Sequence, residues 1–346
     1  MRCRNCSIRP VLLAGLVLAG LAVPAFGVTC TTQSQMTAEQ RTVLAQSAQM
    51  LAANVKSGNT EGVRAQTIAA VASNFGGIAN TIQSINASIQ RATLTVDLLY
   101  LLDATDLKAP QDAQFFCGVA GSPLTVEVTI PNLPPGKYAL AVVHATGVEH
   151  PQQISMILDN DPTGSAVWKL AGFFTKPMTV DGHDGLWFWR QARAYAAQKQ
   201  DWAAWFYYKE AELLEQPVDF ISSPNLQKLH KETEENQPAT VPSDTEPLRL
   251  STSVGSFQVT NIHVGDFNNQ MDLIVTYNAP PNLTMVQARE QVVAVMQALL
   301  QQHPGLKTAF HGLWVYASAP GGRAPFALEL PMNQIENSAP APGERS

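Results

Sequence analysis

The hydrophobic pattern of this chain changes its period once, near Thr93, and this change constrains the fold more than any other feature. Before it, apolar residues recur at helical spacing, for example at Leu44, Ala48, Leu51 and Val55. After it, they alternate along one face of an expected strand, at Leu94, Val96, Leu98, Tyr100 and Leu102. Helices followed by a run of strands are typical of the α+β class.

Local signals indicate where these elements begin and end. Thr37 and Gln40 have capping-box spacing, Gly58 can end the first helix, and Gly76 and Gly77 interrupt the helical pattern before a third amphipathic stretch. Further strands are expected at Ala113–Cys117, Leu124–Ile130, Lys137–Thr146, Gln153–Leu158 and Val167–Phe174. The N-terminal half is therefore expected to hold helices and an antiparallel sheet.

The last two of these strands carry a family resemblance. The segment Trp168-Lys169-Leu170-Ala171-Gly172-Phe173-Phe174, in the hairpin Gln153–Pro177, resembles the final strands of NTF2-like (cystatin-like) domains. The order of elements is similar over residues 37–177. The resemblance implies a bent sheet that encloses a cavity. An Ig-like sandwich for residues 115–177 stays open, because the turn and strand at residues 134–140 are also common in sandwiches.

A helical hairpin is expected at Leu186–Gln216. It resembles one tetratricopeptide (TPR) unit through alternating large and small residues at Phe188, Ala192, Tyr195, Ala204, Tyr208 and Ala211. The chain has no second copy, and solenoids need about three repeats. The sequence thus predicts an isolated hairpin, which we expect to dock on the N-terminal domain.

Composition shifts divide the remaining chain. Residues 231–248 are charged and then rich in Pro and Thr, as in a linker. Strands at 256–264, 271–277, 311–318 and 325–330, with a helix after Thr284, predict a C-terminal ββαββ domain. The expected organisation is a signal peptide (1–27), an NTF2-like domain (28–180), a TPR-like hairpin (181–230), a linker (231–248), a C-terminal domain (249–336) and a disordered tail (337–346).

The first 27 residues have the pattern of a secretory signal peptide. Arg2, Arg4 and Arg9 precede the apolar run Val11–Val23, and small residues at Ala25 and Gly27 allow cleavage after Gly27. The chain also resembles exported bacterial proteins of similar layout. We expect a periplasmic or secreted protein with no stable membrane span after cleavage. An uncleaved anchor and a lipoprotein acylated at Cys30 are the alternatives.

Charge and cysteine content agree with export. Loss of the three signal-peptide arginines takes the formal net charge from −6 to −9, and no basic run follows, which argues against nucleic acid as a partner. Cleavage also removes Cys3 and Cys6. The two remaining thiols, Cys30 and Cys117, are expected to form a disulfide in an oxidising compartment.

The sequence contains no catalytic or metal-binding signature. The seven histidines show no HExxH pattern, no GxSxG motif is present, and we predict no metal and no cofactor. His183 and Asp184 form the one tight His–carboxylate pair, in which Asp184 is interpreted as a helix N-cap. Whether the chain is an enzyme is left open, with a non-enzymatic role favoured.

The helical hairpin carries more aromatic residues than the contact between its two helices can bury. Those outside this contact are Trp187, Trp189, Trp202, Trp205, Phe206 and Tyr207. Two helices alone cannot bury this much aromatic surface, so it forms either interdomain core or a binding face. We therefore expect an exported binding or assembly protein with a protein or peptide partner, with these aromatics, His183 and Asp184 as candidate binding residues. The alternative is an enzyme or small-ligand carrier that uses an NTF2-like cavity.

Overall fold

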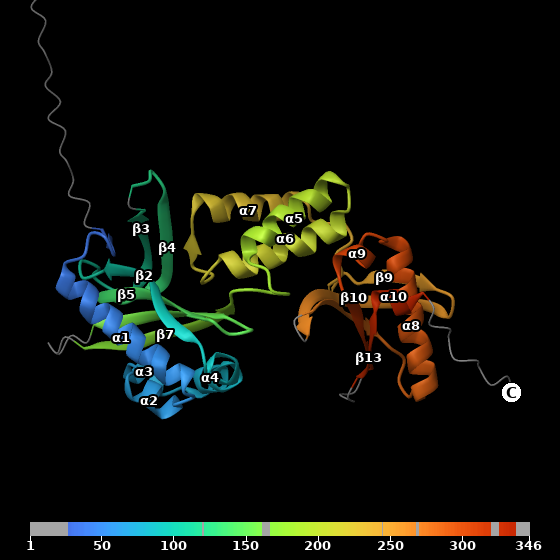
Figure 1. Cartoon of the computed structure of the whole chain (residues 1–346), viewed down its shortest axis with the longest axis horizontal. Coiled ribbons are helices and arrows are strands. Elements are labelled where there is room, and N and C mark those ends of the chain that lie inside the picture. The colour runs from blue at the N-terminus through green and yellow to red at the C-terminus, as the bar shows by residue number, and fades with distance from the viewer. Residues whose placement is uncertain are drawn as a thin grey trace, which may run out of the picture.

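The computed structural model describes residues 27–119, 121–160, 167–243, 245–267, 270–319 and 325–336. Residues 1–26 of the expected signal peptide and the expected disordered tail lie outside these ranges. An N-terminal unit of helices and sheets is followed by a helical segment and then by a C-terminal unit of sheet and helices (Figure 1). The α+β class predicted from the change of period is confirmed at this level.

Helices α1–α4 cover one face of the N-terminal sheet (Figure 1). Their bounds are α1 (Ala38–Lys56), α2 (Thr60–Ala65), α3 (Ala69–Ala72) and α4 (Gly76–Ile89). Helix α1 begins with the predicted capping box, in which Thr37 and Gln40 each accept a hydrogen bond from the other's backbone N–H. Its buried face, which includes Leu44 and Leu51, packs on the sheet.

The N-terminal sheet has five antiparallel strands in the order β1-β2-β5-β6-β7. These strands are β1 (Thr29–Thr32), β2 (Thr93–Asp103), β5 (Lys137–Thr146), β6 (Gln152–Asn160) and β7 (Trp168–Pro177). Residues such as Ala141 and Met156 face the helices, while Leu140 and Ile157 face the opposite side. Both faces of this sheet are thus packed along part of their length.

One expectation for β2 is wrong. Leu94, Val96, Leu98, Tyr100 and Leu102 were expected to share one face, but the pairing of β2 with β5 shifts by one residue between Val96 and Leu98. The bulge turns Leu98, Tyr100 and Leu102 away from the helices, while Leu94 and Val96 stay packed against them. A period-2 pattern cannot reveal a bulge when both faces of the strand are apolar.

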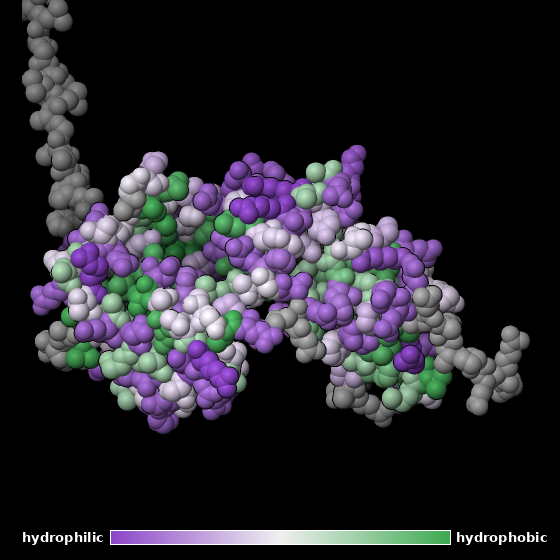
Figure 2. Space-filling model, in the orientation of Figure 1, coloured by the Kyte–Doolittle hydropathy of each residue, from purple (hydrophilic) through white to green (hydrophobic). Residues whose placement is uncertain are grey.

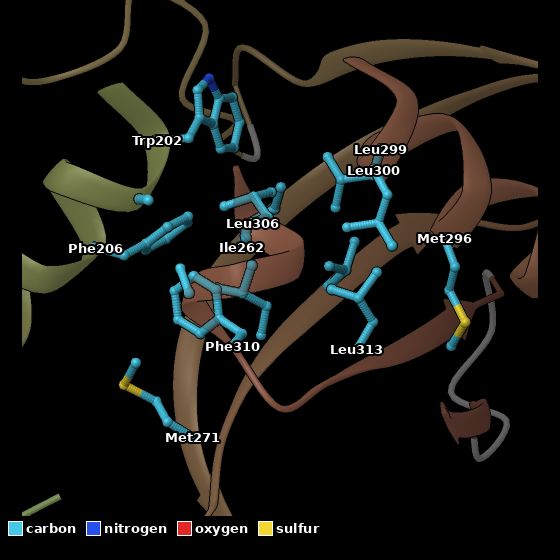
Figure 3. Close-up of a cluster of buried hydrophobic side chains, with 14 of the residues drawn as sticks. Trp202, Phe206, Ile262, Met271, Met296, Leu299, Leu300, Leu306, Phe310 and Leu313 are labelled. Atoms are coloured by element: carbon cyan, nitrogen blue, oxygen red, sulfur yellow. The ribbon is translucent and has the colours of Figure 1, made fainter. Parts of the chain in front are cut away.

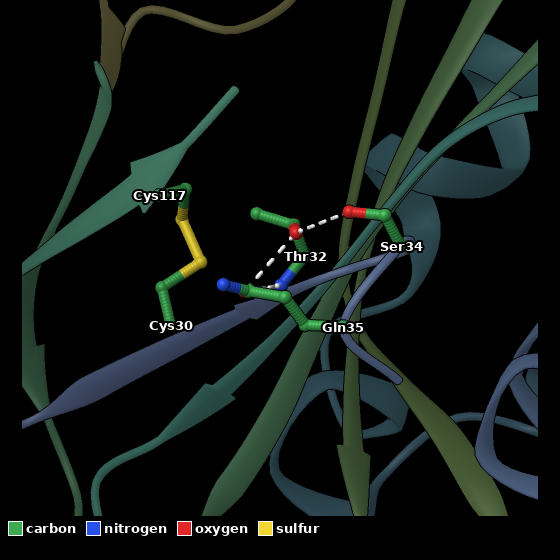
Figure 4. The surroundings of a disulfide bond; sticks show 5 residues. All are labelled: Cys30, Thr32, Ser34, Gln35 and Cys117. Atoms are coloured by element: carbon green, nitrogen blue, oxygen red, sulfur yellow. Dashed lines mark hydrogen bonds between the residues drawn. A yellow bond between two sulfur atoms is a disulfide. The ribbon is translucent and has the colours of Figure 1, made fainter. Parts of the chain in front are cut away.

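A second, three-stranded sheet packs on the other face of the first. It has the order β3 (Gln111–Gly118), β4 (Thr125–Leu133) and β8 (Ile221–Ser222). Cys117 on β3 forms the predicted disulfide with Cys30 on β1, which joins the two sheets (Figure 4). At the end of β1, Thr32 forms hydrogen bonds with the side chains of Ser34 and Gln35 in the turn before α1.

The middle of the chain holds three helices, α5 (Gly185–Ala197), α6 (Asp201–Glu215) and α7 (Pro224–Glu235). The first two form the predicted antiparallel hairpin. Helix α7 packs beside α6 and extends beyond residue 230, so the first residues of the expected linker are helical. Ser223 caps α7 and Pro224 occupies its first turn, a start signal that the sequence contains.

The C-terminal unit is a five-stranded sheet in the order β13-β12-β11-β10-β9, with α8 packed on one face. Its elements are β9 (Leu248–Thr252), β10 (Gly255–Phe267), β11 (Gln270–Asn278), α8 (Met285–Gln302), α9 (Leu306–Ala309), β12 (Gly312–Ser318), β13 (Phe326–Pro331) and α10 (Met332–Ile335). Strand β9 adds one strand to the expected ββαββ order. Strands β11 and β12 run parallel, joined by α8. None of the helices within the described residues is long and apolar enough to cross a membrane.

The helical hairpin lies between the two units rather than only against the N-terminal one (Figure 1). Its aromatic residues share one buried cluster with the C-terminal sheet and α8, as Figure 3 shows for Trp202 and Phe206 beside Leu306 and Phe310. On the other side, Phe220 contacts Phe174 of β7, and β8 pairs with β4. Most of the hairpin's aromatic surface is thus buried against the C-terminal unit, while α6 also contacts β7 of the N-terminal sheet.

Candidate functional site

A cleft of about 280 Å³ lies where the N-terminal sheet meets the helical segment. Its apolar lining comes from Leu98, Tyr100, Val126, Val142, Trp189 and Ile221. In Figure 2, hydrophobic residues gather between the β3–β4 hairpin and helices α5–α7, where these elements border the cleft. Val126 of β4 and Ile221 of β8 form the wall of the cleft on the side of the three-stranded sheet.

The bulge in β2 places a carboxylate in this cleft. Because the register shifts after Val96, Asp97 and Leu98 both line the cleft instead of pointing to opposite faces. Asp97 Oδ1 lies 3.8 Å from His144 Nδ1, and His144 Nε2 lies 3.2 Å from Gln153 Oε1. A polar row therefore crosses three strands at one edge of the apolar surface.

A second carboxylate, Glu215, enters the cleft from the end of α6. Burial raises its pKa, and the nearby carboxylate of Asp184 raises it further. A Cβ atom at Gly185 would lie 2.6 Å from Glu215 Cγ, so the glycine lets α5 begin directly beside this side chain. No Lys or Arg is found among the described residues that line the cleft. The cleft thus combines an apolar surface with two acids, of which Asp97 has His144 as its basic neighbour and Glu215 accepts a backbone hydrogen bond from Leu186.

Trp189 is the one candidate aromatic that lines the cleft. Its indole Nε1 donates a 2.8 Å hydrogen bond to Glu232 of α7, and the Arg193 guanidinium lies 4.5 Å from the ring centroid. Arg193 also forms a two-point ion pair with Glu232, and these hydrogen bonds lower the pKa of the Glu232 carboxyl. The ring is therefore held rigidly on the cleft wall.

No protein-family model, curated protein or solved structure matches this chain.

The other candidate aromatics do not reach the cleft. Trp202 lies 4.2 Å from His303 between ring centroids, Phe206 lies 5.8 Å from Phe310, and both are buried against the C-terminal unit. Tyr207 is buried in the same cluster, while Trp187 and Trp205 are partly buried at its margin. Most of the proposed aromatic face is thus interdomain core, the alternative derived from the sequence.

His183 and Asp184 have structural partners. Asp184 Oδ1 accepts a 2.8 Å hydrogen bond from the backbone N–H of Trp187, which confirms it as the N-cap of α5. The His183 ring stacks on Trp187 with centroids 3.7 Å apart. Neither side chain lines the cleft, although Asp184 acts on Glu215 electrostatically.

Sequence reasoning missed the polar groups that the fold brings together. Asp97 is one of several scattered acids, and nothing in the sequence connects it with Glu215, because the bulge and the docking of α6 create their proximity. A second group brings together three potential metal ligands of the C-terminal unit, namely Asp272 on β11, His311 just before β12 and Glu329 on β13. The starts of these strands were predictable, but their order in the sheet was not.

Proposed function

We propose that this is an exported, non-enzymatic binding protein whose cleft takes an apolar, positively charged segment of a peptide or protein. The observation that supports this proposal is the cleft itself, whose lining combines apolar side chains from the sheet and from α5 with the carboxylates of Asp97 and Glu215. A cationic group on the ligand would compensate these acids, and an adjacent apolar side chain would bury the exposed surface. The signal-like N-terminus and the Cys30–Cys117 disulfide support export.

Titration of the full chain with two synthetic hexapeptides tests the proposal. One consists of leucine and lysine, the other of leucine and glutamate. We expect the lysine peptide to bind and its affinity to fall with salt, while the glutamate peptide binds less tightly. Asp97→Asn and Glu215→Gln are each expected to weaken lysine-peptide binding by roughly two- to fivefold, which is the usual strength of partly exposed ion pairs.

Asp106→Asn is the matched control, since it removes the same charge from an exposed position away from the cleft. Equal affinity for both peptides, or an equal loss in the control, would contradict the proposal. A small-ligand carrier is the second candidate, because the cleft volume approaches that of small-molecule sites. If leucinamide alone bound as tightly as the lysine hexapeptide, the carrier function would replace the peptide-binding one.

A further inference from the structure

Three potential metal ligands lie together in the C-terminal unit, and none of them lines the cleft. Asp272 belongs to β11, His311 directly precedes β12, and Glu329 belongs to β13. Their ligand atoms all lie within 4.8 Å of one another. Because β11, β12 and β13 are neighbours in the sheet, two of the strands and the residue before the third bring their side chains to a single point.

The histidine is fixed from both sides through its backbone. His311 N donates to Met271 O at 2.9 Å, and Met332 N donates to His311 O at 2.9 Å. These bonds hold it between the start of β11 and the end of β13. Its imidazole Nδ1 lies 3.2 Å from Asp272 Oδ1. Because the backbone of His311 is already fixed, only the rotation of its side chain has to be ordered when an ion binds.

Gly312 provides the space in which the two carboxylates meet. A Cβ atom at this position would lie 3.1 Å from both Asp272 Oδ1 and Glu329 Oε1, and 2.9 Å from the backbone oxygen of Leu330. Any side chain here would therefore push against both carboxylates. Gly312 has no positive φ, so space rather than backbone conformation is the reason for a glycine.

The charges at this point favour a cation. Asp272 is only 2% exposed, and Glu329 is partly buried. Across the described residues, neither carboxylate forms an ion pair with Lys or Arg, and His311 is the one basic partner of Asp272. Carboxylates withdrawn from water need a compensating positive charge. A divalent ion would supply it to both at once.

We propose that Asp272, His311 and Glu329 bind one Zn²⁺ ion. Zinc accepts an imidazole nitrogen and carboxylate oxygens together, at about 2.0–2.2 Å, whereas Ca²⁺ and Mg²⁺ prefer oxygen ligands alone. With three protein ligands, a water molecule completes the tetrahedron and leaves a position open to exchange. The ion joins three adjacent strands and is independent of the proposed peptide binding.

Calorimetric titration of the full chain with ZnCl₂, after removal of metals with a chelator, tests the site. We expect one ion per chain and a higher melting temperature in the bound form. Asp272→Asn, His311→Gln and Glu329→Gln are each expected to weaken binding by more than about 100-fold, since even outer-shell changes cost 10–100-fold. His263→Gln, an exposed histidine on the same sheet, is the matched control and should bind normally.

If a variant folds poorly, X-ray absorption spectra of zinc bound to the wild type identify the ligands without any variant. We expect one imidazole and otherwise oxygen ligands. Sulfur ligands would place the ion at Cys3 and Cys6 and overturn the proposal. Unchanged affinity in Glu329→Gln, or tighter binding of Ca²⁺ than of Zn²⁺, would overturn it as well.

Discussion

The hydroxyl of Tyr207 on α6 donates a 2.7 Å hydrogen bond to the backbone oxygen of Ala309, 102 positions further along the chain. Both groups are buried, and burial raises the pKa of Tyr207, so the phenol stays protonated and keeps donating. Phe310 packs on the same ring, with centroids 5.9 Å apart. This contact joins the helical hairpin to the short helix that leads into β12.

Removing the Tyr207 hydroxyl should weaken the contact between the helical hairpin and the C-terminal unit. Tyr207→Phe leaves the Ala309 carbonyl without its donor, and we expect a loss of about 1–3 kcal/mol in the free energy of unfolding, measured with urea. Tyr316→Phe is the control, because it removes a hydroxyl from a partly exposed residue of the same unit. A Tyr207→Phe protein as stable as the control would show that the bond contributes nothing.

Two neighbouring aromatics on α6 should differ in their effect on stability. Phe206 is buried at the contact shown in Figure 3, and Phe206→Ala should cost about 3–5 kcal/mol, as core truncations do. Trp205 belongs to the same set of candidate aromatics, but it is only partly buried. Trp205→Ala should therefore cost less. Thermal unfolding of both variants gives the comparison, and equal losses would contradict this structure of the contact.

Stability should fall as the pH rises from about 5 to 7, because of Glu210. This carboxyl is 8% exposed, and burial together with the nearby charge of Asp266 raises its pKa to about 7. The folded state therefore binds the proton more tightly than the unfolded state, whose pKa is near 4.5. The resulting stabilisation is complete below pH 4.5 and is lost as the pH rises through 7.

Glu210→Gln should remove this pH dependence and stabilise the protein at pH 8 by roughly 2–3 kcal/mol. Urea unfolding at pH 5, 6, 7 and 8 measures it for wild type and variant. Glu61→Gln, a substitution at an exposed position, serves as the control, and its free energy of unfolding should depend on pH as in the wild type. If the Glu210→Gln slope matched that of the wild type, another group would be responsible.

Reduction of the disulfide should destabilise the N-terminal unit. Cys30 and Cys117 are 87 residues apart, so the bond restricts the unfolded chain by about 4 kcal/mol in the loop-entropy description. The melting temperature should fall when dithiothreitol is added. In the double variant Cys30→Ser and Cys117→Ser it should be lower from the start and indifferent to the reagent. Two thiols titratable in the oxidised, unfolded wild type that lacks residues 1–27, and with them Cys3 and Cys6, would refute the bond.

Limited proteolysis should cut between α7 and β9. The linker expected from the sequence covers residues 231–248, but α7 continues to Glu235, which restricts the exposed backbone to the following residues. Subtilisin should therefore cleave near Ala239 and Thr240, both exposed. Because the hairpin shares its core with the C-terminal sheet, the two fragments should elute together in size exclusion under native conditions. Separate elution would show that the shared core does not hold them.

Local sequence signals predicted most helices and strands. The features that they did not predict depend on pairing between residues far apart in the chain. The capping boxes at Thr37 and Thr284 mark helix starts that the structure contains. The break between α2 and α3 has no such signal, because it arises where Thr67 bridges to Leu170 on β7. The candidate cleft was missed for the same reason, since its acids come from a bulge in β2 and from the end of α6.

The parallel pairing of β11 with β12 has a consequence for the order of folding. Leu273 and Leu313 are paired neighbours, yet all of α8 lies between them in the chain. A hairpin such as β10–β11 forms through a short turn. The pair β11–β12, in contrast, can form only after the crossover helix α8 has packed on the sheet. Strand β13 then adds to β12. We therefore expect β12 and β13 to join the C-terminal sheet late in folding. Until then, the edge of β11 that pairs with β12 stays exposed.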